Sequence, residues 1–251
     1  KQFGVVTYTG NGGTNAITGL GFKPDLVWGK MRSPHSYNNM LYDSSRGANQ
    51  VLQSDTTNAE IDISAANSGL RTFDSDGFTI GSESSLNDSG DPIVAWCWRA
   101  NGGTTSSDSS GDITVTRQTN DAAKFSILTY TGNGSAAQTV GHGLGVEPDF
   151  VIATPLNSAG SNRVCWVRGL TLNGDSSQFL KLNTNAAAAV SGQIENVSSS
   201  LITVDGNANL SGKSQLIYCW ANVEGFQKFG TYEGNGNADG PFIYMGFRPK
   251  L

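Results

Sequence analysis

The chain has 251 residues, 32 of them glycine, a formal net charge of −5 and a charged fraction of only 15%. A mildly acidic chain gains nothing from counterion release on a phosphate backbone, so we expect no nucleic-acid binding. The sequence has neither the basic runs that bind anionic lipid surfaces nor an apolar stretch near the roughly 20 residues of a membrane helix, so we expect no membrane insertion.

Short segments rich in β-branched and aromatic residues predict strands in the first hundred residues. The first, at residues 3–8, ends at a Gly-Asn-Gly turn, and a second, at residues 25–30, follows a proline that opens it. Residues 78–80 predict a short strand beside turn residues. The apolar run at 93–98 is typical of a central strand buried on at least one face. We expect no helix in this pattern.

The same pattern then repeats along the chain. The motif Thr-Tyr-Thr-Gly-Asn-Gly at residues 7–12 returns at 129–134, and a third start appears at 229–236. A period of about 122 residues is a whole domain, because solenoid repeats run about 20 to 50 residues. We therefore expect an all-β fold of tandem antiparallel β-sandwich modules, of jelly-roll or lectin-like type.

The repeat sets the expected domain boundaries. Because the third copy stops at Leu251, we expect the sequence to be part of a longer or processed polypeptide. The expected units are a first module at residues 1–104, a flexible Ser/Thr/Gly-rich linker at 105–119, a second module at 120–225 and the incomplete start of a third copy at 226–251.

Residues that both copies keep are expected to serve the shared fold. Asp25 and Asp149 follow a proline at a strand entry, where a carboxylate can accept backbone N–H bonds. Arg46 and Arg168 precede glycine, and we expect them to pair with a carboxylate or with carbonyls of their own module; ligand contact is the alternative. The repeated positions are Tyr8, Tyr130, Pro24, Pro148, Asp25, Asp149, Arg46, Arg168, Cys97, Cys219, Trp98 and Trp220.

Tryptophan and cysteine positions point to packing. Trp98 and Trp220 lie in the most apolar strands and are expected in the core, with a sugar-stacking platform as the alternative. Cys97 and Cys219 occupy equivalent positions, and a disulfide between them would have to join two separate cores. We expect these two and Cys165 to be free, buried thiols.

Cation-binding and catalytic patterns are sparse. His35 and His142 stand at different places in their modules, outside any triad or zinc pattern, and we expect both to lie in loops. We expect no cofactor and no metal, with calcium as the alternative. An EF-hand loop that opened at Asp74 would need Glu at its twelfth position, and that position is Ser85. The minor candidates for a cation in oxygen-rich turns are Asp74, Asp76, Asp205, Asn207 and Asn209.

As a set, the motifs of the first copy resemble a β-rich domain that recurs in virion structural and tail-fibre-like proteins of tailed bacteriophages, especially marine and cyanobacterial ones. The motifs are residues 8–12, 21–28, 41–48, 73–81 and 94–100, and the second copy matches them in diverged form. The resemblance implies a component on the exterior of a virion, with other virion proteins as partners. It carries no catalytic residues over to this chain.

Three functions remain open from the sequence. The first is a surface-exposed tail, fibre or spike protein, a homo-oligomer that contacts host surface polysaccharide. The second is a decoration or assembly protein that binds only other virion proteins. The third is a glycan-cleaving enzyme, which would need paired carboxylates about 5–10 Å apart. We expect no enzyme, but candidate acids for such a pair in the first copy alone are Asp43, Glu60, Asp62, Asp74 and Asp76.

Overall fold

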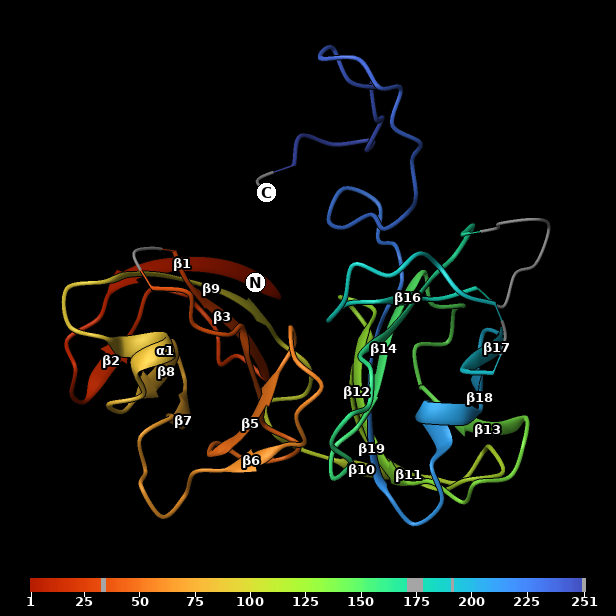
Figure 1. Ribbon diagram of the computed structural model, residues 1–251, viewed down its shortest axis with the longest axis horizontal. Helices are drawn as coiled ribbons and strands as arrows, with labels where there is room; N and C mark the ends of the chain where they lie inside the picture. The colour runs from red at the N-terminus through yellow and green to blue at the C-terminus, as the bar shows by residue number, and fades with distance from the viewer. Residues whose placement is uncertain (33–34, 171–177, 191, 250–251) are drawn as a thin grey trace.

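The computed structural model describes residues 1–32, 35–170, 178–190 and 192–249. In these residues the chain is built almost entirely from strands, and every strand pair in the sheets is antiparallel. The prediction of an all-β fold of antiparallel sandwich modules is confirmed. Figure 1 shows two modules side by side, with the segment that follows β19 rising away from both toward the C-terminus.

Module one consists of a large sheet and a small sheet. The large sheet has the strand order β1 (Phe3–Thr9), β9 (Pro92–Trp98), β3 (Leu26–Met31), β4 (Met40–Asp43), β5 (Gln50–Gln53) and β6 (Ile61–Asp62). The small sheet has the order β2 (Asn15–Ile17), β8 (Gly77–Ile80) and β7 (Leu70–Asp74).

Module two repeats this plan with two strands added at one edge of its large sheet, whereas β6 at the other edge has no counterpart among the described residues. Its large sheet has the order β10 (Ser106–Asp108), β11 (Val115–Asn120), β12 (Phe125–Thr131), β19 (Ser214–Trp220), β14 (Phe150–Pro155), β15 (Val164–Val167) and β16 (Leu180–Lys181). Its small sheet has the order β13 (Gln138–Gly141), β18 (Leu201–Val204) and β17 (Ile194–Val197).

Two expectations about local structure need correction. The expected flexible linker at 105–119 holds β10 and most of β11, which continue the large sheet of module two beside β12. Single helical turns also occur where none was expected: α1 (Ser84–Asn87) in module one and the 3₁₀ turn η1 (Gly206–Asn209) in module two. Each turn begins at a residue whose carboxylate accepts a backbone N–H bond, Glu83 in α1 and Asp205 in η1.

Three apolar layers hold the sheets together. One lies between the two sheets of module one, one lies between the two sheets of module two, and the third joins the large sheets of both modules. Side chains alternate across a strand, so neighbours enter different layers. Val27 is buried in module one, while Leu26 faces the other module. Ile217 is buried in the core of module two, while Leu216 lies in the layer between modules and faces module one.

Both modules use the same face of the large sheet for this shared layer. The strand registers make Leu26 equivalent to Phe150, because each stands opposite the tryptophan at the end of its module, Trp98 or Trp220. All four lie in the layer between modules. The two copies therefore pack as an isologous dimer does, each offering the same patch to the other within one chain.

Candidate functional site

The Gly-Asn-Gly turn of each module is held by the side chain of an asparagine far along the chain, which was not predicted from the sequence. In module one the Asn87 side chain accepts a hydrogen bond from Asn11 N–H at 2.9 Å and donates to Gly13 O at 2.7 Å. Asn209 does the same in module two, with Asn133 N–H at 3.0 Å and Ser135 O at 2.7 Å. The signal was present in the sequence, because the two asparagines stand 122 residues apart, as 209 minus 87 gives.

The repeated tyrosines and glycines belong to the same junction. Tyr8 donates its hydroxyl proton to Leu86 O, and Tyr130 donates to Ala208 O. A Cβ atom on Gly10 would stand 2.0 Å from the carbonyl oxygen of Asp88, so no side chain fits there. The motif thus ties the first strand of each module to its helical turn and serves the fold.

The two repeated aspartates cap the ends of their modules. Asp25 accepts backbone N–H bonds from Ala100 at 2.7 Å and Gly102 at 2.8 Å. Asp149 accepts one from Asn222 at 2.6 Å. Each follows a buried proline, Pro24 or Pro148, immediately before a strand of the large sheet. These carboxylates therefore position the chain that leaves each module.

The repeated arginines differ in burial. Arg168 is partly exposed and donates to Glu147 O and Pro148 O, beside the Asp149 carboxylate at 3.1 Å. Arg46 is buried and donates to the carboxylates of Asp43 and Glu60. Both arginines thus find a carboxylate in their own module.

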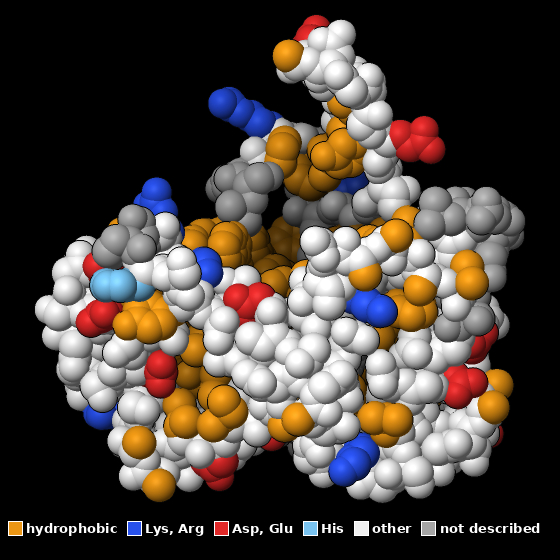
Figure 2. Space-filling view, viewed as in Figure 1, with side chains coloured by type: hydrophobic (Ala, Val, Ile, Leu, Met, Phe, Trp, Pro, Cys, Tyr) orange, Lys and Arg blue, Asp and Glu red, His pale blue; other side chains and the backbone are white. Residues whose placement is uncertain are grey.

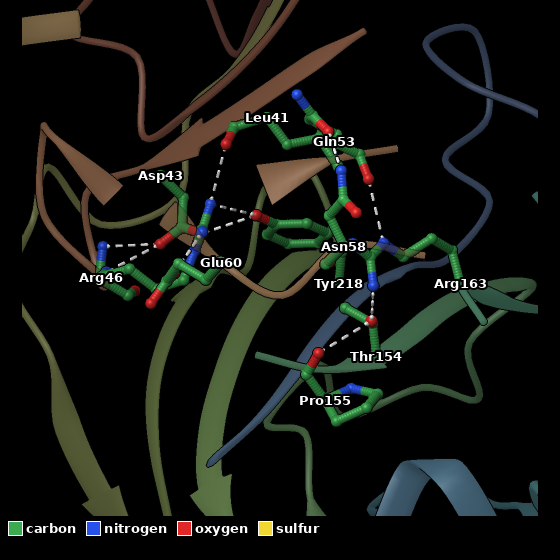
Figure 3. A network of polar contacts seen from close by, with 11 residues as sticks. Leu41, Asp43, Arg46, Gln53, Asn58, Glu60, Thr154, Pro155, Arg163 and Tyr218 are labelled. Atoms are coloured by element: carbon green, nitrogen blue, oxygen red, sulfur yellow. Dashed lines mark hydrogen bonds and ion pairs between the residues drawn. The ribbon is translucent and has the colours of Figure 1, made fainter. Parts of the chain in front are cut away.

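Arg46 also reaches the other module, which the sequence did not predict. Its guanidinium donates to Tyr218 Oη at 3.3 Å, and the Tyr218 hydroxyl donates to Asp43 Oδ2 at 2.6 Å (Figure 3). Burial opposes the positive charge, but the carboxylate of Asp43 raises the pKa of Arg46 above its ordinary value. Burial also raises the pKa of Tyr218, so the hydroxyl stays protonated as a donor. The result is a closed polar contact inside an apolar layer.

A second buried arginine crosses the interface in the opposite direction. Arg163, in module two, donates to the carbonyl oxygens of Gln53 and Asn58 in module one, and to Thr154 Oγ1 at 2.9 Å (Figure 3). Its side chain is almost fully enclosed. Burial lowers the pKa of Arg163 to about 10, which leaves it charged at neutral pH. Gln53 ends β5, Asn58 lies in the loop between β5 and β6, and Arg163 directly precedes β15. No sequence pattern marks this contact.

An aromatic column runs along the edge of the shared layer. The rings of Trp98 and Trp220 meet edge-on with centroids 5.8 Å apart, and Phe150 stacks on Trp220 at 5.4 Å. Phe229, from the segment after β19, stacks on Phe150 at 5.4 Å. The expectation that both tryptophans pack in a core agrees with this geometry, although Trp98 keeps part of its surface exposed.

Beside this column lies a groove of about 720 Å³. Figure 2 shows an apolar hollow between the two modules, below the C-terminal segment. Aromatic side chains from both ends of the chain form its floor and walls, and basic side chains stand among them. The lining includes Phe3, Trp98, Phe226, Phe229, Phe247, Lys1, Lys228 and Arg248. The groove therefore joins apolar surface to positive charge.

The minor cation candidates are engaged in turns. Asp76 accepts N–H bonds from Gly19 and Gly21, and Asp74 accepts the hydroxyl proton of Thr79 at 2.7 Å. Asp205 caps η1. Asn207 lies within the same turn and donates its N–H to Gln193, and Asn209 holds the Gly-Asn-Gly turn. Within the described ranges, none of these residues belongs to a cluster of three or more His, Cys, Asp or Glu side chains.

The two histidines lie in loops, but their environments differ. His142 is fully buried in the loop just after β13. Its Nδ1 accepts the Leu144 N–H at 3.2 Å, so Nε2 carries the proton and faces Ser198 O. Burial lowers the pKa of His142 to about 4, and the ring is neutral at pH 7. His35 is exposed and stands beside Asp91.

The cysteines and the candidate acids serve structure in this arrangement. Cys97, Cys165 and Cys219 are free and buried, and burial raises the pKa of each thiol. Among the acids considered for glycan cleavage, Asp43 and Glu60 share Arg46 as their counter-charge. Asp62 accepts the Ser64 N–H, and Asp74 and Asp76 accept the turn bonds described above, so each of these acids is bound to a local donor.

Comparison with known proteins gives one match. In the described residues, none of the helices is long and apolar enough to span a membrane. A search of curated proteins found no significant match, and a search of solved structures found none either. The model of a family described as a domain of unknown function, DUF7483, matches residues 1–251, which include both modules and the segment after them. The chain therefore belongs to the DUF7483 family.

Proposed function

We propose that the chain is a non-enzymatic structural protein on the exterior of a tailed-phage particle, where it contacts host surface glycans. The observation that carries the proposal is the layer between modules, in which the equivalent residues Trp98 and Trp220 meet. Two modules joined through a full sheet face form a rigid block. Rigid tandem blocks suit a projecting component that must hold its shape under load, and the resemblance of the repeated motifs to tail-fibre-like proteins favours the same role.

The groove supports the glycan part of the proposal. Sugar rings present flat C–H faces that pack on aromatic side chains, and the groove offers Trp98 and several phenylalanines. Pockets for small ligands combine apolar walls with a few charged groups that fix orientation. Here these charged groups are Lys1, Lys228 and Arg248, which favour glycans that carry carboxylate or other acidic groups.

Two experiments test the proposal. Antibody labelling in electron microscopy would locate the chain on particles; label at tail or fibre tips is the expected result. Microarrays of acidic and neutral polysaccharides would then test binding, with Trp98→Ala as the groove variant. The control is Val190→Ala, at an exposed position that does not line the groove. A chain found free of any particle would overturn the virion role. A chain on particles that binds no glycan at millimolar concentration would overturn the glycan contact alone.

A second function, particle assembly, is favoured by one observation. Met245 and Phe247 of the third copy correspond to Leu20 and Phe22 of module one, which are both buried in its core. In the third copy the two equivalent side chains line the groove. The apolar side chains of Met245 and Phe247 would be buried if another protein packed on the groove. If the groove is an assembly surface, crosslinking on intact particles would join residues 225–249 to another virion protein, and free glycans would not compete.

A further inference from the structure

Three metal-ligating side chains converge in loops of module one, outside the layer between modules. His35 lies in the β3–β4 loop, and Asp88 and Asp91 lie between α1 and β9. The Nδ1 atom of His35 is 2.9 Å from Asp91 Oδ2 and 3.8 Å from Asp88 Oδ2. One ligand atom from each of the three lies within 4.8 Å of the others. This is the single group of this kind among the described residues.

The cluster belongs to module one alone. Two backbone bonds align the loops: Arg32 N–H donates to Pro92 O, and Leu156 N–H donates to Ser214 O, both at 2.8 Å. This register places Ala159 at the position of His35. On the other loop, Gly10 N–H donates to Asp91 O, and Gly132 N–H donates to Lys213 O.

The second copy therefore has the loops without the ligands. Lys213 stands at the position of Asp91, and Leu210 at the position of Asp88, because α1 and η1 are themselves equivalent. Both copies keep the backbone bonds that shape the two loops, so neither His35 nor the two carboxylates are needed for that shape. Three polar residues from segments more than 50 positions apart have been gathered in one copy, while the other copy has Ala159, Leu210 and Lys213 there.

An ion pair alone accounts poorly for the set. A protonated histidine balances one carboxylate, and here two carboxylates face the same ring nitrogen. Within the described part of the chain, His35 is the basic group at ion-pair distance from Asp88 and Asp91. Asp88 also accepts the hydroxyl proton of Tyr37 on Oδ2 at 3.5 Å and the Ser89 N–H on Oδ1 at 3.0 Å, and both donors are neutral. Two carboxylates that face one imidazole form a donor set whose negative charge a cation would offset.

We propose that His35, Asp88 and Asp91 bind one divalent cation of the zinc class, with the remaining coordination position open to water. One imidazole nitrogen and two carboxylate oxygens form a donor set that zinc accepts, whereas calcium takes six to eight oxygens. Zinc bonds of about 2.0–2.2 Å in a tetrahedron place ligand atoms roughly 3.4 Å apart. The separations of 2.9 and 3.8 Å lie on either side of that value. The ion would displace the Nδ1 proton and link the β3–β4 loop to the turn after α1.

Calorimetric titration of the full chain with zinc chloride tests the site, with calcium chloride as the comparison ion. We expect one zinc equivalent per chain and at least about tenfold weaker binding of calcium. His35→Ala and Asp91→Lys insert the residues that module two has at these positions, so both variants should fold. Each should weaken zinc binding by about 100-fold or more. His142→Asn, which changes the buried histidine, is the matched control and should bind zinc as the unchanged chain does.

A spectroscopic readout separates this site from other thiol or histidine sites. Cobalt(II) in a tetrahedral site absorbs strongly in the visible range, and the band of the unchanged chain should disappear in His35→Ala. Far-ultraviolet circular dichroism checks that each variant is folded. The proposal is overturned if the unchanged chain binds no zinc at 100 times the protein concentration. It is also overturned if folded His35→Ala and Asp91→Lys bind zinc as tightly as the unchanged chain.

Discussion

Trp98 and Trp220, which hold the same position in two copies of one motif, meet each other edge-on with ring centroids 5.8 Å apart. Each stands at the end of an interior strand of its large sheet, opposite Leu26 or Phe150. A contact between equivalent residues is what a twofold interface produces near its axis. The tandem repeat is thus a covalently linked dimer of modules. We therefore expect substitutions at the interface between modules to have large effects on the free energy of unfolding.

Truncating the buried tryptophan should destabilise the chain strongly. Trp220 is 2% exposed and contacts aromatic rings from four other segments, those of Trp98, Phe125, Phe150 and Phe229. We expect Trp220→Ala to lower the free energy of unfolding by roughly 3–5 kcal/mol in guanidinium denaturation. Trp98→Ala should cost less, because Trp98 is only half-buried. In a double-mutant cycle the two should couple by about 0.5–1.5 kcal/mol. Strict additivity would show that the edge-on contact contributes nothing.

The polar contact between modules should be sensitive to a single hydroxyl. Tyr218→Phe removes the donor to Asp43 Oδ2 and the acceptor for Arg46, while the ring keeps its packing. Because Asp43 is fully buried, its carboxylate would lose a bond that water cannot replace. We expect a loss of about 1–3 kcal/mol in the free energy of unfolding. Tyr232→Phe, at a 69% exposed position, is the control and should change stability by less than about 0.5 kcal/mol. Equal effects of the two changes would contradict the role of this contact.

Alanine substitutions in and beside the repeated turn should differ in their effect on stability, because only some of its glycines lie against other atoms. A methyl group on Gly10 would lie 2.0 Å from Asp88 O, a backbone atom that cannot move without disturbing α1. At Gly13 the nearest atom would be 3.8 Å away, in ordinary contact. We expect Gly10→Ala to cost roughly 3 kcal/mol or more in thermal and chemical denaturation, and Gly13→Ala to cost less than about 1 kcal/mol. A tolerated Gly10→Ala would mean that the turn after β1 is not packed against α1 as described.

Much of the fold could be predicted from the sequence, because strand and turn signals are local. The run at 93–98 forms β9, which pairs with β1 on one side and β3 on the other, and the aspartates after Pro24 and Pro148 are caps. The prediction of a flexible linker at 105–119 was wrong, because the polar composition of this segment is typical of a linker although it forms strands. Edge strands tolerate such composition: β10 pairs with one neighbour and exposes Ser106 and Ser107.

The interface between modules was not predictable from the sequence for a different reason. Side chains alternate along a strand, so the sequence pattern shows which residues share a face of the sheet. It does not show what packs on the face that lies outside the core of the module. Leu26, Leu41 and Leu216 could each have belonged to a core within one module. Arg163 carries no motif, and its partners Gln53 and Asn58 contribute backbone carbonyls that any sequence would offer. Contacts of this kind depend on the docking of two folded units and leave no local signal.

Stability should fall in mild acid through the buried imidazole. Burial lowers the pKa of His142 from an ordinary value near 6.5 to about 4. Below pH 6.5 the imidazole of His142 binds a proton in the unfolded chain, whereas in the folded chain it binds one only near pH 4. The stability associated with this site is therefore complete above pH 6.5 and is lost as pH falls toward 4, by an amount on the order of 2–3 kcal/mol.

His142→Asn isolates this contribution, because an amide can replace the two hydrogen bonds to Leu144 and Ser198 without titrating. Urea denaturation at a series of pH values should give a flatter profile for the variant between pH 6.5 and 4. Below that window both proteins should decline together, because Asp108 and Asp112 have pKa values already lowered by hydrogen bonds and lose those bonds when they protonate. Parallel profiles for the two proteins across the whole range would show that His142 takes up its proton in the folded state as readily as in the unfolded one.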